Sequence, residues 1–186
     1  MNLKAYSKFI KELFFSKIEF VTDYEQSLFR IKFEEIKNLK LIIMDFDDTL
    51  TDHLGELKLK EQSLLERLGK NYKLAFYSNS SDRRTKELDK ISSKLKIYNV
   101  RISEKPDTKG FREILKHFKI KSSETLMIGD KIGTDIYGAY LAKIPTRILV
   151  KPYSQKFGGR KSGFFHSALR SFEKNIYSLT RKVKFN

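Results

Sequence analysis

Five short apolar runs alternate with helical patterns through the middle of this 186-residue chain. Short apolar runs bounded by turn residues are typical of buried strands, and apolar residues three or four apart are typical of helices. Strands that alternate with helices build parallel sheets. The pattern therefore predicts an α/β, Rossmann-like fold with a five-stranded parallel sheet flanked by helices. The strands are expected near 40–46, 73–78, 97–102, 125–129 and 146–150, and the helices near 60–69, 82–95, 108–118 and 134–143.

Two basic segments flank this pattern. A chain of this length forms one domain with additional terminal elements. We divide it into an N-terminal amphipathic helix and lead-in (1–39), a core (40–152) and a basic amphipathic C-terminal helix (153–186). In both terminal segments apolar residues recur every three or four positions, with Lys or Arg between them. Such helices either pack on their own domain or lie on an acidic surface, and the pattern leaves both open.

The net charge of +15 is concentrated near the C-terminus. Residues 151–186 carry nine Lys/Arg and one Glu, so 9 − 1 gives +8 of the total. This charge predicts an anionic partner: phospholipid, nucleic acid or a phosphorylated substrate. Because there is no cysteine, disulfides, zinc-thiolate sites and thiol catalysis are excluded.

The sequence also bears on location. No apolar stretch reaches the roughly 20 residues that span a bilayer, and the start lacks the features of a signal peptide. We expect a cytoplasmic protein that can bind peripherally to the inner membrane face. The Lys-rich amphipathic start leaves an organellar transit peptide open, although Glu12 argues against one.

Polar side chains stand where the predicted strands end. The carboxyl ends of parallel strands share one sheet edge, where open α/β folds bind ligands. Each of these residues alone is explained equally well by a turn, a helix cap or a solvated loop charge. Together they predict one crevice, lined by Asp45, Asp47, Ser78, Lys105, Asp130 and Asp135.

Asp45 and Asp47 have one residue between them. Their carboxylates repel each other in a crevice, so either one is protonated or a cation neutralises them. If the substrate is a phosphate monoester, Asp45 suits attack on phosphorus to form an aspartyl-phosphate. Asp47 suits protonation of the leaving oxygen and later activation of water, provided that the chain turns after the strand and the pKa of Asp47 is raised. Ser78 and Lys105 can hold the equatorial phosphate oxygens.

The same aspartates suit a magnesium ion. Mg²⁺ takes one or two carboxylates together with carbonyl, water and phosphate oxygens. Asp45, Asp130 and the backbone carbonyl of Asp47 form such a set, and Asp135 either orients these ligands or replaces Asp130. The predicted metal residues are thus Asp45, Asp47, Asp130 and Asp135.

With these residues in place, the chain resembles the haloacid dehalogenase (HAD) superfamily of phosphatases. The motifs that carry the resemblance are Asp45-Phe-Asp47-Asp-Thr49, Ser78, Lys105, and Gly-Asp130 through Asp135. The resemblance implies catalytic Asp45, Asp47 and Lys105, and substrate-binding Thr49, Ser78, Asn79 and Lys105.

Within the superfamily, three segments resemble the subclass IIIA phosphatidylglycerophosphate phosphatases. They are Tyr-Ser-Asn-Ser-Ser (77–81), Glu-Lys-Pro (104–106) and Gly-Asp-Lys-Ile-Gly-Thr-Asp-Ile-Tyr-Gly (129–138), and the similarity covers roughly residues 20–155. Asp48 stands where that subfamily commonly has Asn, and Lys131 where Gln is frequent.

The spacing of the motifs bears on the substrate. Only 28 residues separate Thr49 from Ser78, and 26 separate Ser78 from Lys105, and a helix and a strand fill each interval. We therefore expect no cap domain and an open crevice, which favours a phosphorylated lipid headgroup at an anionic membrane surface. Two alternatives stay open: a phosphatase for nucleic-acid ends, nucleotides or phosphoprotein, and a non-catalytic basic module that binds nucleic acid or a membrane.

Overall fold

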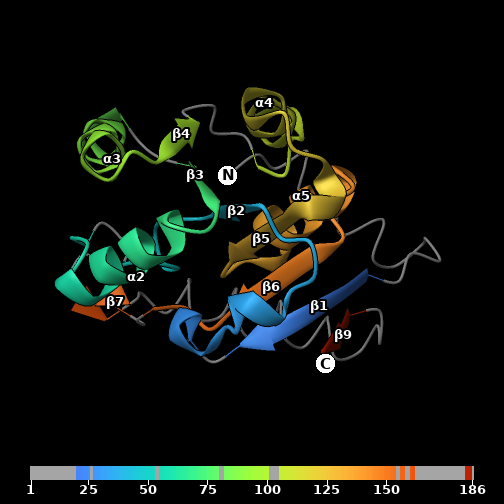
Figure 1. The fold of residues 1–186 in the computed structure, drawn as a ribbon. Helices are drawn as coiled ribbons and strands as arrows, with labels where there is room; N and C mark the ends of the chain where they lie inside the picture. The colour runs from blue at the N-terminus through green and yellow to red at the C-terminus, as the bar shows by residue number, and fades with distance from the viewer. Residues whose placement is uncertain are drawn as a thin grey trace.

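A seven-stranded parallel sheet forms the centre of the molecule (Figure 1). The computed structural model describes residues 20–25, 27–52, 55–79, 82–100, 105–153, 156–157, 160–161 and 183–185. In spatial order the strands are β4 (Tyr98–Val100), β3 (Lys73–Tyr77), β2 (Leu41–Met44), β5 (Thr125–Gly129), β6 (Thr146–Val150), β1 (Phe20–Glu25) and β9 (Val183–Phe185). A short antiparallel pair is formed by β7 (Lys156–Phe157) and β8 (Arg160–Lys161).

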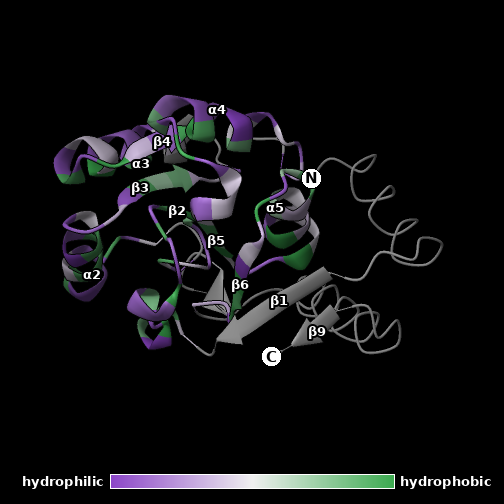
Figure 2. Ribbon diagram, turned by 45° about the vertical axis from the view of Figure 1, so that its right-hand side comes forward, coloured by the Kyte–Doolittle hydropathy of each residue, from purple (hydrophilic) through white to green (hydrophobic). Residues whose placement is uncertain are grey.

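Helices cover both faces of the sheet. One face carries α2 (Leu59–Gly69), α3 (Asp82–Leu95) and the 3₁₀ turns η1 (Leu28–Arg30) and η2 (Phe33–Glu35). The other carries α4 (Lys109–Phe118) and α5 (Tyr137–Leu141), which directly follows the π-helical turn η4 (Ile132–Ile136). The 3₁₀ turn η3 (Ser122–Glu124) leads into β5. Figure 2 shows both hydrophilic and hydrophobic residues along α4, as expected for a helix with one buried side.

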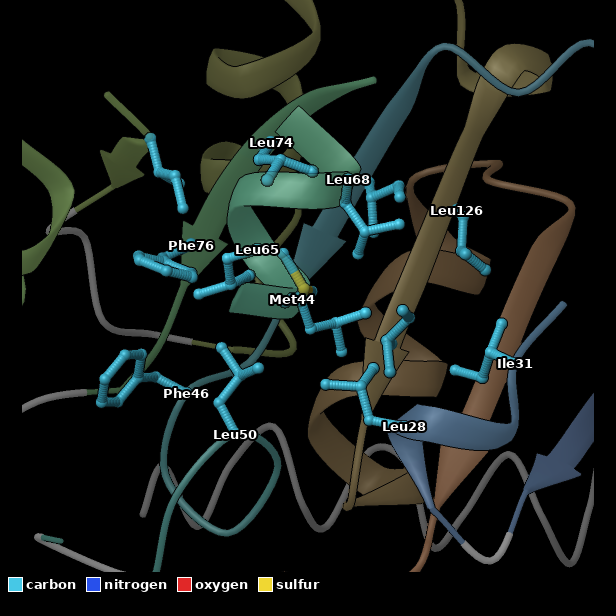
Figure 3. Packing of buried hydrophobic residues seen from close by; sticks show 14 of the residues in the cluster. Leu28, Ile31, Met44, Phe46, Leu50, Leu65, Leu68, Leu74, Phe76 and Leu126 are labelled. Carbon is cyan, nitrogen blue, oxygen red and sulfur yellow. The ribbon is translucent and has the colours of Figure 1, made fainter. Parts of the chain in front are cut away.

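The strands have apolar side chains on both faces because both faces are covered. Every residue of β2 and β5 is buried. In β2, Ile42 and Met44 pack towards α2, whereas Leu41 and Ile43 pack on the opposite side with α4. Figure 3 shows the first of these clusters, in which Leu65 and Leu68 of α2 lie over Met44 and Leu74. This two-sided burial explains why the central strands read as continuous apolar runs.

The five predicted strands are confirmed as the contiguous part β4-β3-β2-β5-β6. Two further strands extend the sheet beyond β6. Strand β1 lies inside the predicted lead-in and pairs with both β6 and β9. Its sequence, Phe-Val-Thr-Asp-Tyr-Glu, carries two acidic residues and lacks the apolar run that revealed the central strands.

Most of both predicted terminal helices lies outside the described residues. Residues 3–15, where apolar positions of the N-terminal segment recur at helical spacing, fall there entirely. Residues 162–182 of the C-terminal segment fall there as well. Val183, the last position of that pattern, begins strand β9. None of the helices in the described part of the chain is long and apolar enough to cross a membrane.

Candidate active site

Four of the six residues predicted to share one crevice, Asp45, Lys105, Asp130 and Asp135, converge at the carboxyl edge of the sheet. The ammonium of Lys105 lies 2.6 Å from Asp45 Oδ1 and 2.5 Å from Asp135 Oδ1, so it joins the loops that follow β2, β4 and β5. One carboxylate oxygen from each of Asp45, Asp130 and Asp135 lies within 4.8 Å of the other two. The strand order places these loops side by side, as the parallel topology requires.

This cluster combines buried negative charge with one fully buried cation. Burial alone would lower the pKa of Lys105, but the charges of Asp135 and Asp45 outweigh it and raise that pKa above its ordinary value. The ammonium therefore stays protonated. Burial raises the pKa of Asp135, and Lys105 opposes this effect. Asp45, Asp130, Asp135 and the neighbouring Asp48 carry four negative charges against the two positive charges of Lys105 and Lys131, which leaves an excess of negative charge. The hard oxygen donors of the three clustered carboxylates fit a divalent cation of the magnesium type.

Asp135 is held by two hydrogen bonds that use both of its oxygens. Oδ1 accepts from Lys105, and Oδ2 accepts from the backbone N–H of Lys131 at 3.0 Å. The residue sits in the π-helical turn η4, a local widening that is frequent at functional sites. Both predicted roles of Asp135, orienting neighbouring groups and direct metal ligation, are compatible with this geometry.

Gly129 makes room for the Asp135 side chain. A Cβ atom at Gly129 would lie 2.4 Å from Asp135 Cβ and 2.5 Å from its Cγ, far closer than non-bonded carbon atoms approach. The glycine that ends β5 therefore allows the aspartate to lie against the strand.

The chain turns after the first aspartate, as the acid/base role of Asp47 requires. The N–H of Asp45 continues the sheet by donating to Ile128 O at 2.9 Å. The N–H groups of Leu50 and Thr51 then both donate to Phe46 O, at 2.9 and 3.3 Å, and close a turn.

Asp48 lies in this turn with a φ of 65°. This left-handed conformation is tolerated by Asp and Asn better than by other non-glycine residues, which explains why either one suits this position. Asp47 is 8% exposed, and its carboxylate is not in the cluster of Asp45, Asp130 and Asp135.

The other predicted substrate-binding residues are Thr49, Ser78 and Asn79. Ser78 and Thr49 are both buried, and the Thr49 hydroxyl makes no hydrogen bond within the described residues. The side chain of Asn79 bonds to the backbone of Lys105. Its Oδ1 accepts from Lys105 N at 3.0 Å, and its Nδ2 donates to Lys105 O at 3.5 Å. Asn79 thus positions the loop that carries the lysine.

Comparison with known proteins agrees with this geometry. A protein family described as HAD-hydrolase-like matches residues 103–152. The chain is 29% identical over 173 residues to "Probable phosphatase YqeG" of Bacillus subtilis (strain 168), covering 91% of this chain and 93% of that protein. It is 40% identical over 53 residues to glyceraldehyde 3-phosphate phosphatase of Pyrococcus furiosus, which is 28% of this chain and 22% of that protein.

Similar solved structures include two hydrolases. One is a HAD-superfamily hydrolase of subfamily IA from Geobacter sulfurreducens, with a TM-score of 0.47, 16% identity, and coverage of 63% of this chain and 89% of that one. The other is a haloacid dehalogenase-like hydrolase from Xanthomonas campestris, with a TM-score of 0.49, 13% identity, and coverage of 74% and 97%.

The chain is thus similar to HAD-like hydrolases over residues 103–152, and to phosphatases among its curated relatives.

Two further residues of this site were not assigned a role from sequence. The Lys131 ammonium lies 3.7 Å from carboxylate oxygens of both Asp48 and Asp130. The Tyr77 hydroxyl donates to Asp107 O at 3.0 Å, and the ring centroid lies 5.5 Å from the Lys105 ammonium. Burial raises the pKa of Tyr77 to about 12, so its phenol stays protonated. Their only sequence signal is adjacency, since Lys131 follows Asp130 and Tyr77 precedes Ser78.

Proposed function

We propose that this protein is a Mg²⁺-dependent phosphomonoesterase that works through an aspartyl-phosphate and acts on phosphatidylglycerophosphate at a membrane surface. The observation that carries the chemistry is the buried contact of Lys105 with Asp45 beside Asp130 and Asp135. The lysine occupies one oxygen of Asp45 and leaves the other for attack.

In the first step an oxygen of Asp45 forms a bond to phosphorus, and the bond from phosphorus to the leaving oxygen breaks. Protonated Asp47 gives its proton to that oxygen, so the alcohol leaves neutral. Lys105, Ser78 and Thr49 hold the equatorial oxygens of the transferring group. Bound Mg²⁺, held by Asp45, Asp130 and the Asp47 carbonyl, would offset the negative charge that gathers as two anions approach.

In the second step Asp47, now a carboxylate, takes a proton from water. The water oxygen bonds to phosphorus, the bond to Asp45 breaks, and inorganic phosphate leaves. Both aspartates then return to their starting protonation states. The buried Asp45 and the turn at Asp48 support these roles, because together they can place the two carboxyl groups on one side of the loop.

Two features support a substrate presented at a surface. In the described parts of the two inter-motif intervals the helices pack on core strands, α2 on β3 and α3 on β4, in keeping with an open crevice. Two large apolar side chains of the described chain are also exposed, Phe29 by 43% and Leu59 by 81%. The Lys60 ammonium lies 5.1 Å from the Phe29 ring centroid. Apolar side chains with lysine between them suit an anionic leaflet, to which each lysine adds about 1 kcal/mol.

A substrate comparison with and without Mg²⁺ tests the function. We expect Mg²⁺-dependent release of phosphate from phosphatidylglycerophosphate in vesicles at a higher kcat/KM than from a 3′-phosphorylated oligonucleotide. Turnover of the oligonucleotide but not of the lipid would refute the substrate, and no turnover of any phosphomonoester would refute the enzyme.

The exposed apolar residues can be tested separately. Leu59→Glu should weaken binding to anionic vesicles and leave hydrolysis of a soluble phosphomonoester unchanged. Ser93→Glu adds the same charge at an exposed position near the C-terminal end of α3 and is the matched control. Equal vesicle binding by both variants would argue against this membrane contact.

A further inference from the structure

The chain returns to the catalytic turn after the last strand of the core. Strand β6 ends at Val150, and the backbone N–H of Tyr153 then donates to Asp48 O at 2.6 Å. Asp48 is the residue in the left-handed conformation, immediately after Asp47. The backbone of the turn that follows Asp47 is therefore bonded directly to the segment after β6.

The side chain of Tyr153 anchors this contact to helix α2. Its hydroxyl donates to Glu61 Oε1 at 2.8 Å. Glu61 stands in the first turn of α2 and is only 1% exposed. The ammonium of Lys60 lies 3.5 Å from the same oxygen, and those of Lys58 and Lys60 lie 5.1 and 5.5 Å from the Tyr153 ring centroid. The tyrosine is therefore held at its hydroxyl and beside its ring.

Burial of the Glu61 carboxylate is energetically unfavourable. Its second oxygen, Oε2, is buried and has no hydrogen-bond partner among the described residues. Burying a carboxylate costs several kcal/mol unless it is paired, and a neutral residue would fill the same space at a lower cost in free energy. Burial and the bond to Glu61 raise the pKa of Tyr153, so its phenol stays protonated and remains a donor at physiological pH.

We infer that Tyr153 and Glu61 form a latch that holds the Asp48 turn in the conformation that presents the Asp47 carboxyl to the leaving group. Both are positioning residues, since the contacts found for them reach the loop backbone and α2. The inference deepens the proposed function and rests on it, because a held acid/base has a use only in an enzyme.

Tyr153→Phe tests the latch by removing the hydroxyl and retaining the ring. If Asp47 is misplaced, it protonates the leaving oxygen less efficiently. Only a poor leaving group needs that proton. We expect kcat for an alkyl phosphate to fall by about 10- to 100-fold, with a much smaller fall for p-nitrophenyl phosphate and little change in KM for either. Equal losses of kcat for both substrates would overturn the inference, because they indicate only a smaller folded fraction.

Tyr98→Phe is the matched control. The Tyr98 hydroxyl donates to Glu113 Oε1 at 2.9 Å, so the variant loses the same type of bond on the α4 side of the sheet. It should keep the wild-type ratio of the two kcat values. A change of that ratio equal to the one in Tyr153→Phe would overturn the latch.

Amide hydrogen exchange tests the latch without catalysis. Peptides that cover residues 46–52 should exchange faster in Tyr153→Phe than in the wild type or in Tyr98→Phe. Unchanged exchange would overturn the latch even in an active enzyme. Conversely, a wild-type protein that hydrolyses neither phosphate refutes the proposed function, and the exchange data then decide the latch alone.

Discussion

At the residue scale, the central question is what Asp45 does. Its carboxylate is buried and in contact with Lys105, an arrangement that suits a nucleophile held in one orientation. Asp45→Asn keeps the shape but cannot form the aspartyl-phosphate. We expect turnover to fall on the order of 10⁴-fold or more, while the variant still binds inorganic phosphate. Rapid acid quenching should trap a phosphoprotein in the wild type and none in Asp45→Asn. Undiminished turnover would exclude Asp45 as the nucleophile, and no turnover by the wild type would favour the non-catalytic alternative.

Gly129 provides a residue-scale test of the geometry. Because an added Cβ would collide with Asp135, Gly129→Ala should destabilise the fold by about 1–3 kcal/mol, as overpacking does. Displacement of Asp135 should also weaken phosphate binding through Lys105. Thermal unfolding and phosphate titration measure the two effects. In the matched variant Gly69→Ala the nearest atom, Leu74 Cδ1, is 3.8 Å away, so its stability should stay near that of the wild type.

At the scale of elements, hydrogen bonds between the loops at the strand ends hold the site together. The side chain of Asn79, after β3, bonds to the backbone of Lys105, after β4. Asn79→Ala removes both bonds, each worth about 1 kcal/mol. We expect KM for a soluble phosphomonoester to rise about tenfold, which is roughly 1.4 kcal/mol, with a smaller effect on kcat. Asn99→Ala, which loses a bond to Asp89 instead, should leave KM unchanged.

The sequence patterns predicted some of the helices and strands better than others. The apolar runs predicted all five central strands, because two-sided burial demands continuous apolar sequence. The helical pattern at 134–143 predicted a helix but not its first turn, which is π-helical at 132–136. That turn places Asp135 against Gly129 and Lys105, contacts that arise only when β5 and the loop before α4 are packed together.

At the scale of the whole molecule, a divalent cation should stabilise the folded state. The site gathers three carboxylates that are brought together only by folding. A ligand that binds only the folded state at 100 times its Kd adds about 2.7 kcal/mol. We therefore expect Mg²⁺ to raise Tm and EDTA to abolish both this increase and phosphatase activity. Asp130→Asn should fold but lose the Mg²⁺-dependent increase. An equal increase in Asp130→Asn would place the ion elsewhere.

The sequence by itself determined the α/β class, the central strands and the grouping of Asp45, Lys105, Asp130 and Asp135 at one sheet edge. It could do so because the spacing of apolar residues and the positions where strands end are local properties of the sequence. Only the tertiary structure decided that Lys105 pairs with Asp45 and Asp135, that Asn79 holds the backbone of Lys105, and that Tyr153 returns to Asp48. These contacts join residues far apart in the chain. They depend on side-chain packing across strands and loops, which the local spacing of apolar residues does not predict.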